Sequence, residues 1–161
     1  MTADSKENTE ALLKMACQEA ERGVESDDGG PFGALVVKNG RILAIGHNEV
    51  LLTNDPTAHA EVTVIRRAAA ALGHWNLAGC ELYTSCKPCP MCLGAALWSG
   101  IEKIYYSLSE EDAAAAGFRD KAFYDLLSDS SSLNAYMEHV PVDGMENAMQ
   151  MWINKENKEQ Y

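Results

Sequence analysis

The sequence predicts an α/β protein in which helices cover both faces of a single mixed five-stranded sheet. Segments with helical spacing of apolar residues alternate with short apolar runs typical of strands, and strands separated by single helices usually lie parallel. An Asn39-Gly40 pair between two such runs predicts an antiparallel hairpin, so we expect both strand orientations in one sheet. The 161 residues show no internal repeat and no boundary, so we expect a single domain over residues 1–161.

Local patterns justify the elements in chain order. Leu13, Cys17 and Ala20 recur at helical spacing and mark the buried face of a first helix. After the hairpin, Asp55-Pro56-Thr57 supplies capping residues and a proline for the start of the next helix, and Pro90 marks another start in the same way. The expected elements are a helix over 6–24, strands over 34–37 and 42–45, a helix over 55–72, a strand over 80–84, a helix over 90–99, a strand over 103–106, helices over 110–116 and 120–127, a polar linker over 128–132, a short strand over 137–141 and a helical tail over 143–158.

Composition and charge limit the classes of function that fit this chain. The formal net charge is −11 and the pI about 4.7, so the chain lacks the basic balance that phosphate contacts require, and a small substrate is favoured over a nucleic acid. Five cysteines, three of them clustered, suit a metal in a reducing compartment better than a disulfide framework. Residues 1–10 are polar and no apolar run reaches membrane-spanning length, so we expect a cytoplasmic protein without a membrane partner.

Two short motifs carry the chemistry, His59-Ala60-Glu61 and Pro88-Cys89-Pro90-Met91-Cys92. His59, Cys89 and Cys92 supply one imidazole and two thiolates, a set that holds Zn²⁺ and leaves a fourth coordination position for water. The pattern H-x-E followed by P-C-x-x-C is a described signature of zinc deaminases, in which the Glu is a general acid and base outside the metal shell. We therefore predict one Zn²⁺ per subunit, with the carboxylate of the first motif transferring protons.

The spacing within the motifs places these groups at helix starts. Two residues that are two apart in a helix diverge by about 200°, so His59 and Glu61 can share one metal-bound water only at the opening turn. Cys89 and Cys92 are three apart and return to one face beside Pro90, at a helix N-terminus, where the macrodipole lowers the thiol pKa. Two helix N-termini facing one cation favour anionic ligands and a hydroxide.

Cys86 leaves an alternative open, because Cys86-Lys87-Pro88-Cys89 is also a C-x-x-C. We place Cys86 at a strand end and interpret it as a small buried thiol. The rival is a structural site with His59 and all three cysteines, which would be closed to water.

Residues 31–34, 47–48, 54–61 and 83–92 resemble the cytidine deaminase-like superfamily. Within it, residues 113–120 and Tyr161 resemble the bacterial guanine deaminase branch, so the resemblance spans nearly the whole chain. Lys87 departs from the pattern, since relatives often have Glu there.

The resemblance implies roles for individual residues and for the assembly. The zinc ligands would be His59, Cys89 and Cys92, and the proton-transferring carboxylates Glu61 and Asp120. Purine contacts would come from Asn48, the Ala60 backbone, Phe32 and Tyr161. The branch also implies a homodimer that exchanges C-terminal tails, so that Asp120 and Tyr161 can serve the partner's site.

The residues by themselves leave simpler interpretations open for most of these positions. Asn48 is also a typical turn residue, Asp120 a typical helix cap, and Phe32 a typical core residue. Tyr161 is at the end of the chain.

The predicted chemistry is hydrolytic deamination of a purine. Zinc lowers the pKa of its bound water to about 7, and Glu61 moves a proton from that water to the ring nitrogen and the departing amine. Guanine presents N1–H and N2–H₂ donors, which suit a carboxylate such as Asp120, so guanine is the favoured substrate. Guanosine and other aminated heterocycles stay open, because space for a ribose is not visible in a sequence.

Two rival functions use the same motifs. The first is tRNA adenosine deamination, which requires a basic face and strongly salt-dependent binding, against the acidic balance of this chain. The second is a non-catalytic dimerisation module stabilised by zinc, in which Glu61 would have no function.

Overall fold

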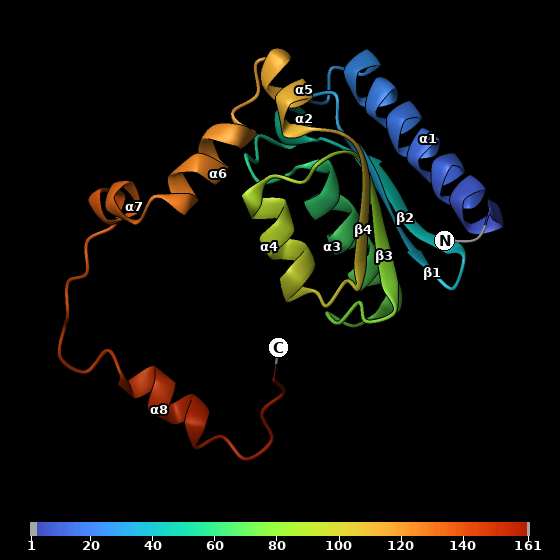
Figure 1. Cartoon of the computed structure of the whole chain (residues 1–161). Coiled ribbons are helices and arrows are strands. Elements are labelled where there is room, and N and C mark those ends of the chain that lie inside the picture. Colours follow the sequence, from blue (N-terminus) through green and yellow to red (C-terminus); the bar gives the residue numbers. More distant parts are fainter. Residues whose placement is uncertain (1–2, 161) are drawn as a thin grey trace. The chain divides into compact units, whose positions relative to one another are not determined.

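The computed structural model describes residues 3–160, with the side chains of residues 6–160. The chain divides into two compact units, the first ending at Tyr124 and the second beginning at Asp125. Among the described helices, none has the length and apolar character that a bilayer crossing requires. The elements, labelled in Figure 1, are α1 (Ala3–Glu25), β1 (Gly33–Lys38), β2 (Arg41–His47), α2 (Val50–Thr53), α3 (Ala60–Leu72), β3 (Cys80–Cys86), α4 (Pro90–Trp98), β4 (Lys103–Leu108), α5 (Glu110–Ala115), α6 (Asp120–Ser128), α7 (Ser130–Tyr136) and α8 (Asn147–Ile153).

A sheet in the order β2-β1-β3-β4 forms the centre of the first unit (Figure 1). β1 pairs antiparallel with β2 and β3, whereas β3 and β4 are parallel. Asn39 and Gly40 join β1 to β2 with φ values of 51° and 74°, the left-handed conformation that a two-residue hairpin turn requires. The predictions of one mixed sheet and of this hairpin are confirmed.

Helices cover both faces of the sheet, as predicted. α1 packs on one face, where Leu12 and Ala16 meet Leu35, Val37 and Tyr83. α3 and α4 lie on the other face (Figure 1), where both contribute to a second apolar cluster. β1 is buried along almost its whole length, because its alternate side chains enter the two clusters. The two helices on the second face bring the predicted metal ligands together.

The helix that we predict from Asp55 begins five residues later, at Ala60, so the predicted start is wrong. The Asp55 side chain caps a turn instead, accepting hydrogen bonds from the amide of Thr57 at 2.8 Å and from its hydroxyl at 2.7 Å. The backbone is then extended at His59 before the helix begins. The structure also contains α2, which no sequence pattern indicated.

The second unit differs most from the expected elements. Residues 128–132, predicted as a linker, contain the start of α7, because the Asp129 side chain accepts hydrogen bonds from the amides of Ser131 and Ser132. The helix predicted over 143–158 is shorter and is limited to α8.

The predicted fifth strand is not confirmed. Residues 137–141 belong to no strand in the described chain, and the sheet has four strands. Large apolar side chains of this unit, among them Tyr136, Met149 and Met151, are exposed. The described residues of the second unit, 125–160, therefore form no buried core of their own.

Candidate metal centre and substrate pocket

Three metal-ligating side chains meet where α3 and α4 begin. His59 is the residue before α3, Cys89 is the residue before α4, and Cys92 lies in the first turn of α4. Their candidate ligand atoms all lie within 4.8 Å of one another, and Cys89 Sγ is 3.6 Å from His59 Nδ1. Among the residues that the structure describes, no other group of three or more such side chains is found.

The donor set of this group fits zinc. One imidazole nitrogen and two thiolates match the ligands of catalytic zinc sites, in which a fourth position stays open. The side-chain hydrogen bond from Cys92 lowers the pKa of Cys89, while the same contact together with burial raises the pKa of Cys92. One thiol of the pair thus ionises readily, and a bound cation supplies the charge that ionises the second.

Cys86 is not part of this group. It ends β3, as predicted, and its Sγ donates a hydrogen bond to the Ser109 carbonyl at 3.3 Å. Burial raises the pKa of the Cys86 thiol to about 11, which keeps it protonated at neutral pH. The five cysteines are all free thiols. The described structure therefore does not assemble the four-ligand alternative.

Glu61 lies beside the metal ligands and is almost completely buried. The Thr84 hydroxyl donates a hydrogen bond to its Oε1 at 3.0 Å, and the Cys92 thiol is 3.4 Å from its Oε2. Burial raises the pKa of Glu61 above its ordinary value, because desolvation disfavours the carboxylate. A carboxyl group with a raised pKa is suited to accept and return a proton near neutral pH.

A cavity of about 380 Å³ opens beside these groups, a volume within the range of small-molecule sites. All of its lining residues belong to the first unit. The lining includes six of the predicted site residues: Phe32, Asn48, His59, Glu61, Cys89 and Asp120. Of the other three, Cys92 and Ala60 are fully buried and Tyr161 lies outside the described residues.

Gly29 and Gly30 also line the cavity, although we identified no motif that includes them. The Asn48 Oδ1 accepts hydrogen bonds from the Gly30 amide at 3.3 Å and from the Val50 amide at 3.1 Å. A Cβ on Gly29 would lie 2.2 Å from the same oxygen, so no larger residue fits without a shift. The two consecutive glycines are the feature of the sequence that could have predicted this close approach.

Phe118 is another lining residue that we did not assign to the site. Its ring meets the Phe32 ring edge to face, with centroids 4.6 Å apart. The two aromatic side chains form an apolar wall of the cavity, next to the loop that contains Gly30. The feature of the sequence that could have identified Phe118 is its position two residues before Asp120.

α6 places Asp120 in the cavity wall. The Tyr124 hydroxyl donates a hydrogen bond to the Pro88 carbonyl at 2.7 Å, which joins the first turns of α6 to the loop before Cys89. Burial raises the pKa of Asp120, and the neighbouring Cys89 acts in the same direction. In this structure Asp120 and Glu61 line the same cavity of one chain.

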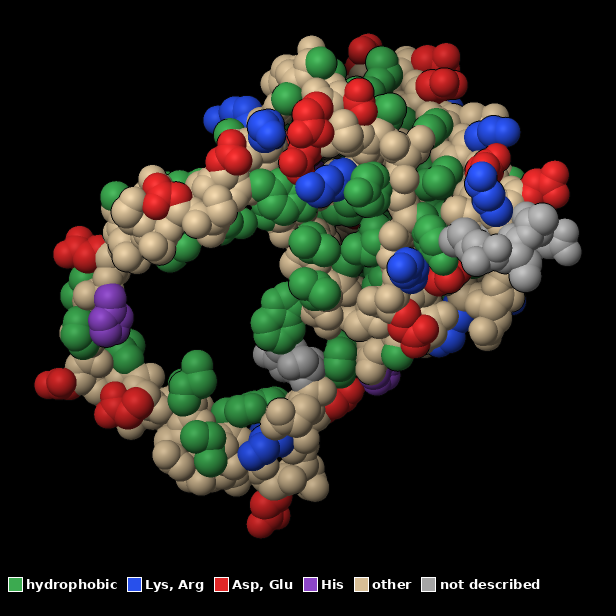
Figure 2. All heavy atoms as spheres, in the orientation of Figure 1, with side chains coloured by type: hydrophobic (Ala, Val, Ile, Leu, Met, Phe, Trp, Pro, Cys, Tyr) green, Lys and Arg blue, Asp and Glu red, His purple; other side chains and the backbone are tan. Residues whose placement is uncertain are grey.

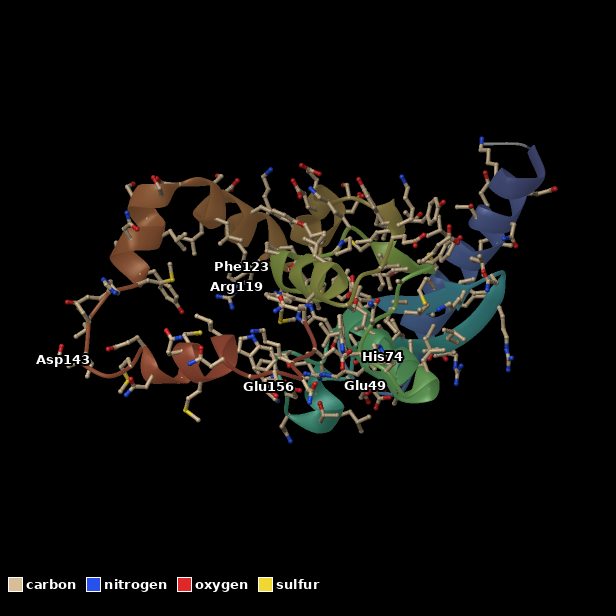
Figure 3. The ribbon with its side chains drawn as sticks, turned by 90° about the horizontal axis from the view of Figure 1, so that it is seen from below. Glu49, His74, Arg119, Phe123, Asp143 and Glu156 are labelled. Atoms are coloured by element: carbon tan, nitrogen blue, oxygen red, sulfur yellow. The ribbon has the colours of Figure 1, made fainter. Side chains whose placement is uncertain are left out.

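Residues on either side of Asp120 have other contacts. Arg119 and Phe123, labelled in Figure 3, lie side by side, with the guanidinium 5.5 Å from the ring centroid. Lys87 forms an ion pair with Glu110, and its ammonium lies 4.6 Å from the Tyr124 ring centroid. Lys87 therefore joins α5 and α6 to the loop before the metal centre.

With this geometry the chain belongs to the family defined by the cytidine and deoxycytidylate deaminase zinc-binding region, which matches residues 6–108. It is a zinc-dependent hydrolytic deaminase. Over 161 aligned residues it is 45% identical to a guanine deaminase of Bacillus subtilis strain 168, covering 96% of this chain and 99% of the relative. A crystal structure of guanine deaminase from Bacillus subtilis superposes with a TM-score of 0.89 at 44% identity, covering 94% of this chain and 98% of that one.

A different kind of deaminase matches a shorter part of the chain. A tRNA-specific adenosine deaminase of Aquifex aeolicus is 45% identical over 98 residues, which cover 61% of this chain and 64% of the relative. The two relatives have the same sequence identity to this chain, but the alignment with the guanine deaminase covers more of it.

Proposed function

We propose that this protein hydrolyses guanine to xanthine and ammonia, with one Zn²⁺ per subunit held by His59, Cys89 and Cys92. The observation that carries the proposal is an open nitrogen-and-sulfur donor set at the wall of a cavity that also contains Glu61 and Asp120. The likeness to guanine deaminases over nearly the full chain supports guanine as the substrate, since the likeness to a tRNA deaminase covers a smaller part.

Zinc held by His59, Cys89 and Cys92 would act as a Lewis acid and would lower the pKa of a bound water to about 7. The chain supplies the proton transfers: Glu61 accepts one proton of the attacking water and donates it to the purine ring nitrogen, and then transfers the second proton of that water to the departing amine. Its raised pKa and its hydrogen bond from Thr84 support this role. The buried position also limits exchange of the proton with solvent.

Four groups position the base. Asn48 lines the cavity, and its Oδ1 already accepts hydrogen bonds from the amides of Gly30 and Val50, which leaves its side-chain nitrogen to donate to the purine. The Ala60 amide is among the first four of α3, which have no acceptor within the helix, and it donates to the base. The Asp120 carboxylate accepts from the N1–H and N2–H₂ donors of guanine, and the Phe32 ring packs against the purine.

The dimer expected from the sequence is part of the proposal. Figure 2 shows hydrophobic side chains gathered over α4 and β4, and the exposed ones include Leu97 and Trp98 at 69% and 68%. β4 is at an edge of the sheet, with one side free to accept another strand. We infer a homodimer that covers this face of the first unit.

The second unit completes the proposed dimer. Residues 125–161 would be exchanged, so that residues 137–141 form the fifth strand and Tyr161 reaches the partner's site. The exposed apolar side chains of this unit support the exchange, because burial in a partner would stabilise them. In this assembly residues 1–161 act as one deaminase domain. The cytoplasmic location expected from the sequence stays a prediction.

The test is ammonia release from the zinc-loaded protein with guanine, guanosine, adenine, cytosine and tRNA as separate substrates. We expect release from guanine, with xanthine as the product. Release from guanosine alone would move the assignment to nucleosides, and release from tRNA or cytosine alone would overturn it. If no substrate releases ammonia and the Glu61→Gln variant is unchanged in zinc content and stability, the non-catalytic module is supported.

A further inference from the structure

His47 is held between two carboxylates that come from different parts of the chain. Its Nδ1 is 2.9 Å from Oε1 of Glu19, in α1, and its Nε2 is 2.8 Å from Oδ2 of Asp28, in the loop after α1. The side chain of His47 is 14% exposed and that of Glu19 is 8% exposed. A Cβ on Gly23 would lie 2.8 Å from the His47 ring, so α1 accommodates the imidazole only where it lacks a side chain.

This geometry favours an imidazolium. A neutral imidazole has a single N–H, so one of the two carboxylates would face a lone pair instead of a donor. Burial by itself lowers the pKa of His47, but the hydrogen bonds to Glu19 and Asp28 outweigh burial and raise that pKa above its ordinary value. Arg22 pairs with the second oxygen of Glu19. Glu49, which follows His47 by two residues and is labelled in Figure 3, is paired with Arg67 of α3.

The loop that His47 holds is a wall of the substrate cavity. The Asp28 carbonyl accepts hydrogen bonds from the amides of Leu51 and Leu52 in α2, at 3.0 Å each. Gly29 and Gly30 follow Asp28 directly and line the cavity, where they meet Asn48, the residue after His47. Asp28 is thus connected to both partners of this contact: the glycines follow it in the chain, and Asn48 follows its partner His47. A displacement of Asp28 would therefore move the glycines and Asn48.

We infer that His47 is a positioning residue for purine binding, whose imidazolium holds the Asp28-Gly29-Gly30 loop against α1 and thereby keeps Asn48 in its binding orientation. The inference rests on the proposed function for the identity of the ligand. Loss of the His47 proton releases one of the two carboxylates and loosens the cavity wall. The metal ligands and Glu61 are not touched by His47, so substrate binding weakens while the chemical step continues.

The first experiment measures the ring protonation directly in the zinc-loaded full chain. In protein labelled with ¹⁵N at histidine and glycine, we expect both ring nitrogens of His47 to carry protons at pH 7. The Gly29 and Gly30 amide signals should shift with the His47 titration as the pH rises. The inference is overturned if His47 is neutral at pH 7, or if the Gly29 and Gly30 amide signals do not change as His47 titrates. Either result holds whether or not guanine is the substrate.

The second experiment measures the pH dependence of KM for guanine in the wild type and in His47→Gln. The Gln amide is neutral and donates from one nitrogen, so it cannot hold both carboxylates. We therefore expect KM to rise about tenfold at pH 7, the factor that ~1.4 kcal/mol produces, with kcat and zinc content within about twofold. Wild-type KM should rise through the His47 titration, and the variant's KM should lack that step. An unchanged KM, or a loss confined to kcat, overturns the inference.

Two further variants separate positioning from folding. Asp28→Asn retains the imidazole and the contact with Glu19 but removes one charge, and we expect about a threefold rise in KM. His74→Gln, at an exposed histidine after α3, is the matched control and should leave KM and its pH dependence unchanged. If Asp28→Asn is folded and has the wild-type KM, His47 has no positioning role. If the protein has no guanine activity but the Gly29 and Gly30 amide signals still follow the His47 titration, guanine is not the substrate, and the role of His47 in positioning the loop is retained.

Discussion

Glu61 is a carboxylate with little solvent contact, beside three candidate metal ligands and within reach of one hydroxyl group. Replacement by Gln retains the shape of the side chain and removes its ability to accept a proton. We expect Glu61→Gln to lower kcat for guanine by about 10²- to 10⁴-fold, the range attributed to general acid–base catalysis, with unchanged zinc content. Glu7→Gln, an exposed change in α1, is the control. A variant that retains wild-type kcat would remove Glu61 from the mechanism.

Asp120 tests the substrate assignment. Its carboxylate lines the cavity but does not belong to the metal-ligand group, so the two functions can be separated. We expect Asp120→Ala to lose far more guanine activity than zinc, measured as kcat/KM against bound metal per chain. Parallel loss of metal and activity would mean that Asp120 supports the metal centre and not the purine.

Cys86 tests whether the metal shell is open. Its thiol donates to a backbone carbonyl and its raised pKa keeps it protonated, which makes it a poor zinc ligand. We expect Cys86→Ala to retain one zinc per chain, whereas Cys89→Ala loses it, by metal analysis after dialysis. Zinc loss from both variants would indicate that Cys86 is a ligand after all.

At the scale of elements, the metal centre is built from the N-terminal ends of α3 and α4 and from β3. α3 and α4 each begin with a ligand in extended conformation, followed by the first helical turn, and β3 supplies Thr84 to Glu61. The later start of α3 is consistent with this role, because a helix from Asp55 would have placed His59 within the helix, away from its first turn. Asp55 instead shapes the turn that leads into the ligand.

The contact between α1, β2 and the Asp28 loop has a consequence for stability. The raised pKa of His47 means that the folded protein retains this proton more strongly than the unfolded chain. The stabilisation is fully present below about pH 6.5, the unfolded value, and is lost as the pH rises through the folded value. We expect His47→Gln to destabilise the zinc-loaded protein by about 1.5 kcal/mol at pH 6 and by less at alkaline pH. Urea titrations across this range measure it, and a difference that does not depend on pH would contradict the assignment.

At the scale of the whole molecule, the proposed exchange can be tested by mixing inactive chains. In an exchanged dimer of one Glu61→Gln chain and one Tyr161→Ala chain, one site has an intact Glu61 and receives an intact Tyr161. After unfolding and refolding of an equal mixture, we expect recovery of about a quarter of wild-type activity, since half of the dimers are hybrids with one complete site of two. Without exchange no hybrid site is complete, and refolded mixtures would be as inactive as the separate variants.

Much of the site was predictable because its residues are close in sequence. His59 and Glu61 are two apart, Cys89 and Cys92 are three apart, and both pairs lie beside helix starts, so local spacing predicted the donor set and the zinc chemistry. The family was indicated by the resemblance of these motifs and is confirmed by the match to residues 6–108. The alternation of helical and strand patterns likewise predicted a mixed sheet with helices on both faces. The expected elements were least accurate after residue 128, where polar residues that cap a helix resemble those of a linker.

The sequence by itself determined which side chains can hold the metal, because ligand type and spacing are local properties of the chain. Only the tertiary structure decided which distant residues share the cavity. Gly29 reaches Asn48, Thr84 reaches Glu61, and His47 lies between Glu19 and Asp28, across 28 and 19 residues of sequence. Such contacts depend on strand order and helix packing, which bring separate segments together through buried surface and leave no periodic signal in the sequence.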